Sequence, residues 1–251
     1  MQKYKHIIFI ALLLCLFFLP IQSAATQEIT EGMLTDSISW RLEDNTLIIS
    51  GSGQLPTVSH YPWYDHRSDI TALIVEPGIT HIGQGAFSGC TNLTQVTLPE
   101  SLTGIGINAF SYCSALEQIT IPNGVKRIEA KAFAECSSLS QITLPASVTF
   151  IGEYAFRNCE ALRSISLPEN LKTLDEGAFY YCTSLEQIVL PPLLQAVEAY
   201  AFYNCSALTA VTLPREAKEI KDYAFYSCYC LTDVTFSDKV TVVGMNAFGN
   251  P

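Results

Sequence analysis

Residues 132–154 read AFAECSSLSQITLPASVTFIGEY, and the pattern of this stretch recurs through most of the chain. The pair Ala-Phe returns every 23 residues, with its alanine at positions 86, 109, 132, 155, 178, 201, 224 and 247. In seven copies a cysteine follows the phenylalanine by three residues, and a leucine follows the cysteine by three more. Eight copies in one register, without an insertion, predict an array of structural repeats over residues 70–251.

Each repeat contains a short segment with the features of a β-strand. In residues 141–144, Gln-Ile-Thr-Leu alternates polar and apolar side chains, and Pro145 follows. Alternation with a period of two indicates a strand, and proline ends it because it lacks a backbone N–H group. A single repeat cannot bury its apolar side chains, so neighbouring repeats must stack. The sequence therefore predicts a strand-rich solenoid with one parallel sheet of about eight short strands, joined by short turns or 3-10 segments.

These columns resemble the leucine-rich repeats of the BspA-like class, found in bacterial surface and secreted proteins. The pattern of that class is close to L-x-x-I-x-L-P-x-x-(V/L)-x-x-I-G-x-x-A-F-x-x-C, and residues 70–251 follow it. The first copy departs from it, with Ile70 in place of leucine and Glu76 in place of proline. The resemblance implies an α/β leucine-rich-repeat solenoid and a role in adhesion to host matrix proteins, host cells or other bacteria.

Residues 1–25 have the composition of a secretory signal peptide. Lys3 and Lys5 precede an apolar run from Ile7 to Leu19, and small residues follow up to Ala25. Such a run is shorter than the roughly 20 apolar residues of a spanning helix. We expect a secreted or cell-surface protein with no stable membrane insertion after cleavage of the signal.

Residues 26–69 predict a small β cap in front of the repeats. Two alternating segments, Ile38 to Leu42 and Leu47 to Ile49, are joined by the turn-forming pair Asp44-Asn45. This arrangement is typical of a β-hairpin. A hairpin at this position would hide the strand edge of the first repeat.

Composition excludes one class of partner. The chain of 251 residues has 14 Lys plus Arg against 24 Asp plus Glu, a formal net charge of −10. An acidic surface repels phosphate groups, so we expect no binding to nucleic acid. With 49% apolar and 15% charged residues, the chain has the composition of a folded protein.

The nine cysteines allow two interpretations. In an exported protein they suggest disulfides, and stacked repeats bring neighbouring cysteines within disulfide range. Their single repeat position favours instead a column of buried free thiols that pack as small apolar groups and offer weak S–H donors to loop carbonyls. No C-x-x-C spacing occurs, so we expect neither structural zinc nor another cofactor.

Catalytic motifs are absent from the sequence. His60, Asp65, His66 and Asp69 lie close together and form a hypothetical acid–base or metal cluster. No nucleophile elbow, H-E-x-x-H motif or P-loop accompanies them. We therefore interpret these residues as part of a solvated loop and expect a non-enzymatic protein.

Two groups of surface residues are candidates for binding. The first is a ladder of uncharged strand residues: Gln95, Gln118, Gln141, Thr97, Thr120 and Thr143. The second is a group of tyrosines around the later Ala-Phe pairs: Tyr180, Tyr181, Tyr200, Tyr203, Tyr223, Tyr226 and Tyr229. Each group also has a structural interpretation, since threonine suits exposed strands, stacked glutamines can satisfy one another, and tyrosine can cover gaps between loops.

Binding is the function that this sequence favours. We expect the partner to be a host or bacterial surface protein or a glycan. The alternative is a structural module that spaces or displays another region of a larger surface protein.

Overall fold

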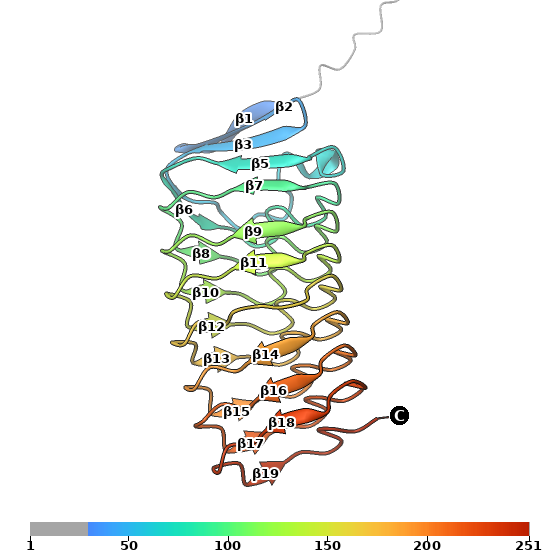
Figure 1. The fold of residues 1–251 in the computed structure, drawn as a ribbon. Helices are drawn as coiled ribbons and strands as arrows, with labels where there is room; N and C mark the ends of the chain where they lie inside the picture. Colours follow the sequence, from blue (N-terminus) through green and yellow to red (C-terminus); the bar gives the residue numbers. More distant parts are fainter. Residues whose placement is uncertain (1–29, 251) are drawn as a thin grey trace, which may run out of the picture.

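The structure of the protein is a computed structural model that describes residues 30–250. The chain winds into a stack of coils, and each coil is one repeat (Figure 1). Residues one repeat apart pair in parallel strands, as Ile119 does with Ile142 and Ile188 with Val211. The predicted solenoid of leucine-rich repeats is confirmed.

One row of strands corresponds to the segments that the sequence predicts. It consists of β5 (Ala72–Val75), β7 (Gln95–Thr97), β9 (Gln118–Thr120), β11 (Gln141–Thr143), β14 (Gln187–Val189), β16 (Ala210–Thr212) and β18 (Asp233–Thr235). The fifth repeat contributes only an isolated bridge from Ser164 to Gln187. Serine is less suited to a strand than the threonine and glutamine of the neighbouring repeats, because its hydroxyl competes for local backbone groups.

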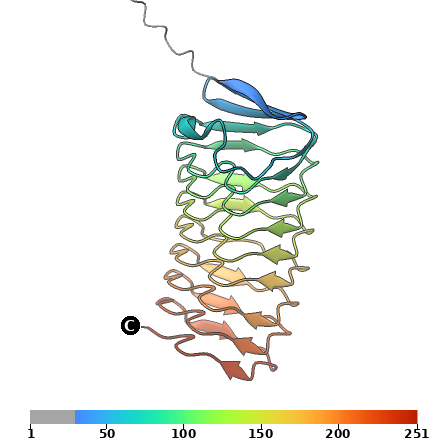
Figure 2. The same ribbon diagram turned by 180° about the vertical axis from the view of Figure 1, so that it is seen from behind.

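A second row of strands, which the prediction of a single sheet missed, runs along the side of the coils (Figures 1 and 2). It consists of β4 (Gly53–Gln54), β6 (Ile79–Ile82), β8 (Gly104–Ile105), β10 (Arg127–Ile128), β12 (Phe150–Ile151), β13 (Thr173–Leu174), β15 (Ala196–Val197), β17 (Glu219–Ile220) and β19 (Val242–Val243). Most of these strands have two residues, which is too short for a periodic pattern to be visible. The solenoid therefore has two strand rows rather than one.

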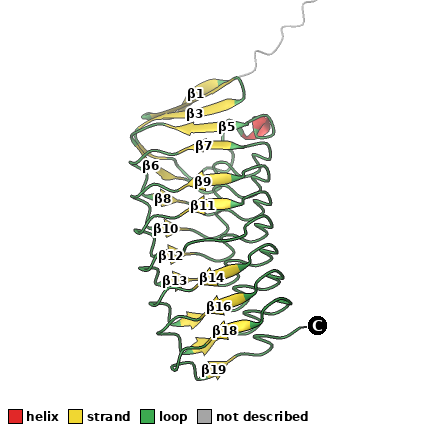
Figure 3. Ribbon diagram, in the orientation of Figure 1, coloured by secondary structure: helices red, strands yellow, loops and turns green. Residues whose placement is uncertain are grey.

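The fold class is confirmed, although the label α/β describes it only loosely because the described residues contain almost no helix. Within residues 30–250 the only helix is η1 (Tyr64–His66), a single 3-10 turn (Figure 3). The remaining connections between strands in this part of the chain are turns and irregular segments. No helix of this part of the chain combines the length and apolar character needed to cross a membrane.

Three strands precede the first repeat: β1 (Glu31–Thr35), β2 (Ile38–Glu43) and β3 (Thr46–Gly51). β2 and β3 form an antiparallel hairpin around Asp44 and Asn45, which both have positive φ angles. β3 then pairs in parallel with β5, so the hairpin continues the first strand row (Figure 1). The predicted signal peptide, residues 1–25, lies outside the described residues.

A ladder of phenylalanine rings runs through the core. The rings from Phe87 to Phe248 stack one repeat apart, with centroid distances of 5.2–5.7 Å. From Phe87 to Phe225 each side chain is at most 1% exposed. The alanine column is equally buried, so the Ala-Phe pair marks a crowded turn.

Trp63 closes the N-terminal end of this ladder. Its ring is stacked on that of Phe87 at a centroid distance of 6.1 Å and on that of Tyr61 at 4.9 Å. Its indole Nε1–H donates to the carbonyl of Ala86 at 2.7 Å. In later repeats the phenylalanine backbone N–H donates to the next alanine carbonyl, as from Phe87 to Ala109 at 2.9 Å. The Trp63 indole N–H therefore makes the hydrogen bond to the next coil that the phenylalanine backbone N–H makes in later repeats.

The seven repeat cysteines are buried free thiols, as favoured by their spacing. From the second repeat on, each thiol donates to the phenylalanine carbonyl of the preceding coil at 3.1–3.3 Å, as Cys136 does to Phe110. Burial raises the pKa of Cys90, Cys136 and Cys228 to about 12. These thiols are therefore structural donors and remain protonated at neutral pH.

Candidate functional site

The later Ala-Phe turns carry a continuous group of tyrosine rings, which we call the Tyr cluster. Its members are Tyr154, Tyr180, Tyr181, Tyr200, Tyr203, Tyr223 and Tyr226. Tyr203 connects the group, because its ring centroid lies 4.9 Å from Tyr180 and 5.2 Å from Tyr226. Tyr200 stacks on Tyr223 at 5.3 Å with an interplanar angle of 2°. The structure thus brings six of the seven tyrosines singled out in the sequence into one surface. Tyr229, the seventh, is exposed and stacks on no ring of the described residues.

Tyr154 is a member that the sequence reasoning missed. Its ring meets Tyr180 edge to face at 5.7 Å, and its hydroxyl donates to Glu176 at 3.3 Å. The signal was present in the sequence, since Tyr154 precedes an Ala-Phe pair just as Tyr200 and Tyr223 do. Gly177 has this position in the next repeat, and a Cβ atom there would lie 2.2 Å from the Tyr154 ring. The glycine therefore makes room for this ring.

The backbone of the Ala-Phe turns is unusual at two positions. The residue before the alanine has a positive φ angle in all eight copies, for example 57° at Tyr200, and the second residue after the phenylalanine has one in the first seven, for example 61° at Tyr181. Such a conformation costs a non-glycine residue about 1–2 kcal/mol. Asn108, Asn246 and Gly85 take the same position as Tyr200 and suit it better. Backbone conformation therefore does not explain the choice of tyrosine, which points to a role for its side chain.

The stacking determines what the cluster presents to solvent. Several rings are stacked on a neighbour, as Tyr203 is on both Tyr180 and Tyr226, so part of their apolar area is covered inside the cluster. Tyr181 is the most open member, with 37% of its surface exposed. Burial, assisted by the nearby Glu176 carboxylate, raises the pKa of Tyr154 to about 12. Burial also raises the pKa of Tyr180 and Tyr203, so these phenols are hydrogen-bond donors at neutral pH.

Charged residues border the cluster on the side of the earlier repeats. Arg157 lies 5.9 Å from the Tyr180 ring centroid and forms an ion pair with Glu135 at 3.4 Å. Lys131 lies 5.9 Å from the ring of Tyr154. Cations of both kinds favour aromatic faces, so they help to hold this edge of the cluster in place.

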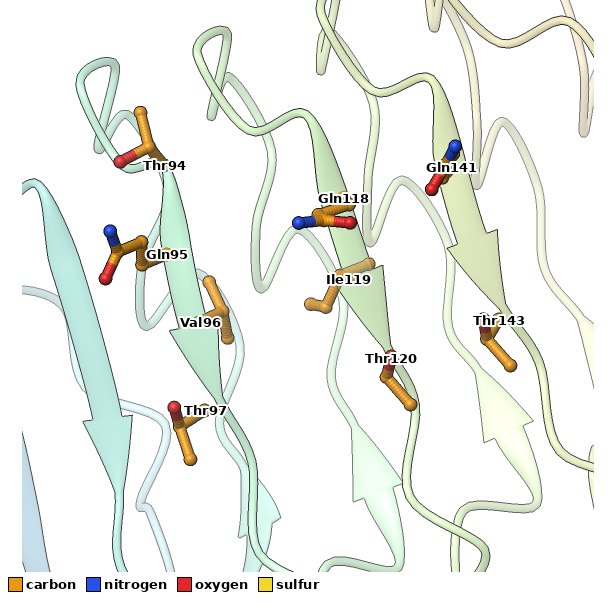
Figure 4. A pocket seen from close by; sticks show the side chains of 9 residues that line it. All are labelled: Thr94, Gln95, Val96, Thr97, Gln118, Ile119, Thr120, Gln141 and Thr143. Carbon is orange, nitrogen blue, oxygen red and sulfur yellow. The ribbon is translucent and has the colours of Figure 1, made fainter.

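The second candidate surface, the Thr/Gln face, lies on β7, β9 and β11 (Figure 4). Gln95, Gln118, Gln141, Thr97, Thr120 and Thr143 are all exposed there. The three repeats place them beside a shallow hollow of about 350 Å³. Within residues 30–250 none of these six side chains hydrogen-bonds to another residue, so the expected mutual satisfaction of the glutamines is absent. Their polar groups are available to a ligand.

The histidines and aspartates near η1 form two separate pairs rather than one cluster. His60 Nε2 lies 3.8 Å from Asp65 Oδ2, and His66 Nδ1 lies 3.9 Å from Asp69 Oδ2. Among the described residues, no group of three or more His, Cys, Asp or Glu side chains is placed to hold a metal ion.

The repeats assign the chain to a known family. A family model described as "BspA type Leucine rich repeat region (6 copies)" matches residues 57–182 and 126–251. This chain belongs to the BspA-type leucine-rich repeat family. The match covers both candidate surfaces of this BspA-type protein and the loop that carries Trp63.

Solved structures agree with this assignment. A leucine-rich repeat protein from Bacteroides ovatus is 31% identical, with a TM-score of 0.66, over 84% of this chain and 55% of that protein. The BspA-type chain thus spans about half the length of this relative. The T. pallidum leucine-rich repeat protein TpLRR, 22% identical over 85% of this chain and 86% of its own, has a TM-score of 0.55 and shows the fold alone. A search of the curated proteins found no match.

Proposed function

We propose that this protein is a secreted or cell-surface binding protein without enzymatic activity, and that the Tyr cluster is the surface that contacts a partner protein. The observation that carries the proposal is the continuous stacking of seven tyrosines, several of them at positions where the backbone favours glycine or asparagine. Adhesion is the role that the resemblance to the BspA-like class implies, and the match to the family model supports that resemblance.

The chemistry of the cluster suits a protein partner. Tyrosine combines a large apolar area with a hydroxyl, and it loses little conformational entropy on binding. Here neighbouring rings already fix each tyrosine in the folded protein, so binding loses little further side-chain entropy. Because stacked pairs such as Tyr200 and Tyr223 cover part of each other's rings, the cluster favours a protein surface over a sugar ring, which needs an open aromatic face.

Export is supported by the composition of residues 1–25, with two lysines ahead of a short apolar run. The acidic charge of the chain favours partners with basic surfaces and disfavours nucleic acid.

The test is saturable binding of the purified protein to immobilised fibronectin, fibrinogen and laminin. One variant carries Tyr180→Ser, Tyr203→Ser and Tyr226→Ser. Serine reproduces Ser88 and Ser111, which have the same repeat position in earlier coils, so the variant is expected to fold. The matched control carries Gln95→Ser, Gln118→Ser and Gln141→Ser on the Thr/Gln face.

The proposal predicts binding that the tyrosine variant loses and the glutamine control keeps. Equal binding by the tyrosine variant would place the site elsewhere, and loss in the control alone would assign it to the Thr/Gln face. If the folded protein binds none of the three proteins, adhesion to these matrix proteins is contradicted and the spacer alternative is favoured.

A further inference from the structure

A second recess lies on the Ala-Phe side of the solenoid, next to the N-terminal loop. It has a volume of about 590 Å³, within the usual range of small-ligand sites. Its wall comes from the loop before η1 and from the first turns of the repeat array. The residues that matter most are His60, Tyr64, Ser88, Asn108, Ser111 and Tyr112. We call it the junction pocket.

The junction pocket exists because small residues replace the tyrosines of later repeats. Ser88 and Ser111 have the repeat position of Tyr180, and Gly85 has that of Tyr200. The space that rings fill in the Tyr cluster is therefore open in the first two turns. The same repeat positions therefore carry tyrosine rings in the later coils and border a pocket in the first two.

The loop before η1, which forms one wall of the pocket, is fixed by side-chain contacts. The Tyr61 hydroxyl donates to the carbonyl of Pro56 at 2.6 Å, and the Trp63 indole donates to Ala86. The ring of Tyr64 lies 4.4 Å from that of His60, and the Arg67 guanidinium lies 3.9 Å from the centroid of the Tyr64 ring. The pocket is therefore formed before any ligand arrives.

Two groups in the wall have no partner of their own. Ser111 is 2% exposed as a residue, but its hydroxyl oxygen is not fully buried and borders the pocket, where it makes no hydrogen bond to another described residue. Tyr112 is 57% exposed at a φ angle of 62°, and its ring contacts no other ring of residues 30–250. A hydroxyl that borders the pocket without a protein partner and a strained, open aromatic ring both favour a role in binding.

We propose that the junction pocket binds a neutral sugar residue, such as the terminal hexose or N-acetylhexosamine of a glycan. Hydroxyl and amide groups, from Ser88, Ser111 and Asn108 among others, both donate and accept hydrogen bonds, which matches a ligand made of hydroxyls. No Asp, Glu, Lys or Arg lines the pocket, and the imidazole of His60 lies 3.8 Å from Asp65, so the wall offers no unpaired counter-charge to a charged ligand. The free face of Tyr112 supplies the apolar platform on which the C–H face of a sugar ring packs.

The test is NMR titration of the full protein with the methyl glycosides of glucose, galactose, mannose and N-acetylglucosamine, and with that of sialic acid as the charged probe. Tyr112→Ser removes the platform. Ser88→Tyr fills the pocket with the residue that later repeats accept at this position. Tyr203→Ser, in the Tyr cluster, is the matched control, and thermal melting checks that each variant is folded.

The proposal predicts shifts of the amides of Ser88, Asn108 and Tyr112 with at least one neutral glycoside. Both pocket variants should weaken this binding by about tenfold or more, while Tyr203→Ser leaves it unchanged. Absence of a response to every neutral glycoside, a response to sialic acid alone, or unchanged binding by both folded pocket variants would overturn it. None of these outcomes depends on the Tyr cluster, so the two proposals fail separately.

Discussion

At the residue scale, the buried thiols make the stability of the protein sensitive to alkaline pH. Burial raises the pKa of every repeat cysteine above its ordinary value of 9.0, to about 12 at Cys90, Cys136 and Cys228. The folded state therefore keeps protons that the unfolded state releases above this value. Stability from these groups is complete below the unfolded pKa and declines as the pH rises towards the folded one.

We predict that the free energy of unfolding falls steeply above pH 9. Each thiol contributes a slope of up to about 1.4 kcal/mol per pH unit, and the seven act in the same direction. Urea unfolding between neutral pH and pH 10.5 measures the slope. The variant Cys136→Ala, which has one ionisable group fewer, should show a smaller slope. An unchanged free energy of unfolding over this range would contradict burial of free thiols.

Thiol reactivity provides an independent check. In the native protein, Cys230 is exposed and should react rapidly with a chromogenic disulfide reagent, whereas the seven repeat cysteines should react only after denaturation. Fewer free thiols than this after denaturation without a reductant would show that neighbouring cysteines are oxidised.

Gly177 tests how the Tyr cluster is built. Gly177→Ala places a Cβ atom at a φ angle of 59° and 2.2 Å from the Tyr154 ring, so it should displace that ring. Gly85→Ala is the matched control, because it has a φ angle of 65° and nothing within 4 Å of the added atom. Both variants pay for the backbone strain, and Gly177→Ala should lose about 0.5–1.5 kcal/mol more through the ring contacts of Tyr154. Equal unfolding free energies would mean that Tyr154 adapts without cost.

The sequence predicts the environment of the cysteines but not the backbone conformation of the tyrosines. A cysteine that recurs at one repeat position predicts a buried column. All its members face the same way, and a small apolar thiol favours the core. The positive φ angles of Tyr181, Tyr200 and Tyr223 were not predictable, because glycine and asparagine are the usual signals for that conformation. The sequence therefore groups the tyrosines by their repeat position but does not show that their backbone is strained.

At the scale of elements, the phenylalanine ladder holds the coils together. Phe156 is fully buried between Phe133 and Phe179, whereas Phe248 is only partly buried and packs against Phe225 at the last repeat. In a repeat array each coil is stabilised by its neighbours, so the position of a ring along the ladder determines its contribution.

We predict that Phe156→Ala lowers the free energy of unfolding by about 3–5 kcal/mol, the usual cost of removing a buried aromatic ring. Phe248→Ala should cost clearly less because its ring is partly exposed. Chemical denaturation of both variants measures the difference. Equal losses would show that the ladder does not act as a core.

The two strand rows differ in how well the sequence predicts them. The β7, β9 and β11 row follows from alternating polar and apolar residues ending at proline. In contrast, β10 has only Arg127 and Ile128, and no periodicity is visible in two residues. Tertiary stacking creates the second row, because each pair of residues becomes a strand only when the next coil lies beside it.

At the scale of the whole molecule, the period of 23 residues predicts the solenoid, while the Tyr cluster and the junction pocket lie at repeat positions where the residue type changes from coil to coil. The same side positions carry tyrosine in the later coils and serine or glycine in the first. This gives one side of the solenoid a cluster of rings near one end and a pocket near the other. The pocket was not predicted, because its loop and repeats meet only in the folded chain.

Oxidative footprinting of the tyrosines tests the central proposal most directly. The protein is oxidised alone and in complex with whichever of the three matrix proteins binds it, and modification of each tyrosine is measured by mass spectrometry. We predict protection of Tyr180, Tyr181 and Tyr203, with Tyr112 equally modified in both samples. Protection of other surfaces while these three remain reactive, or the absence of any complex, would contradict the assignment of the Tyr cluster as the protein-binding surface.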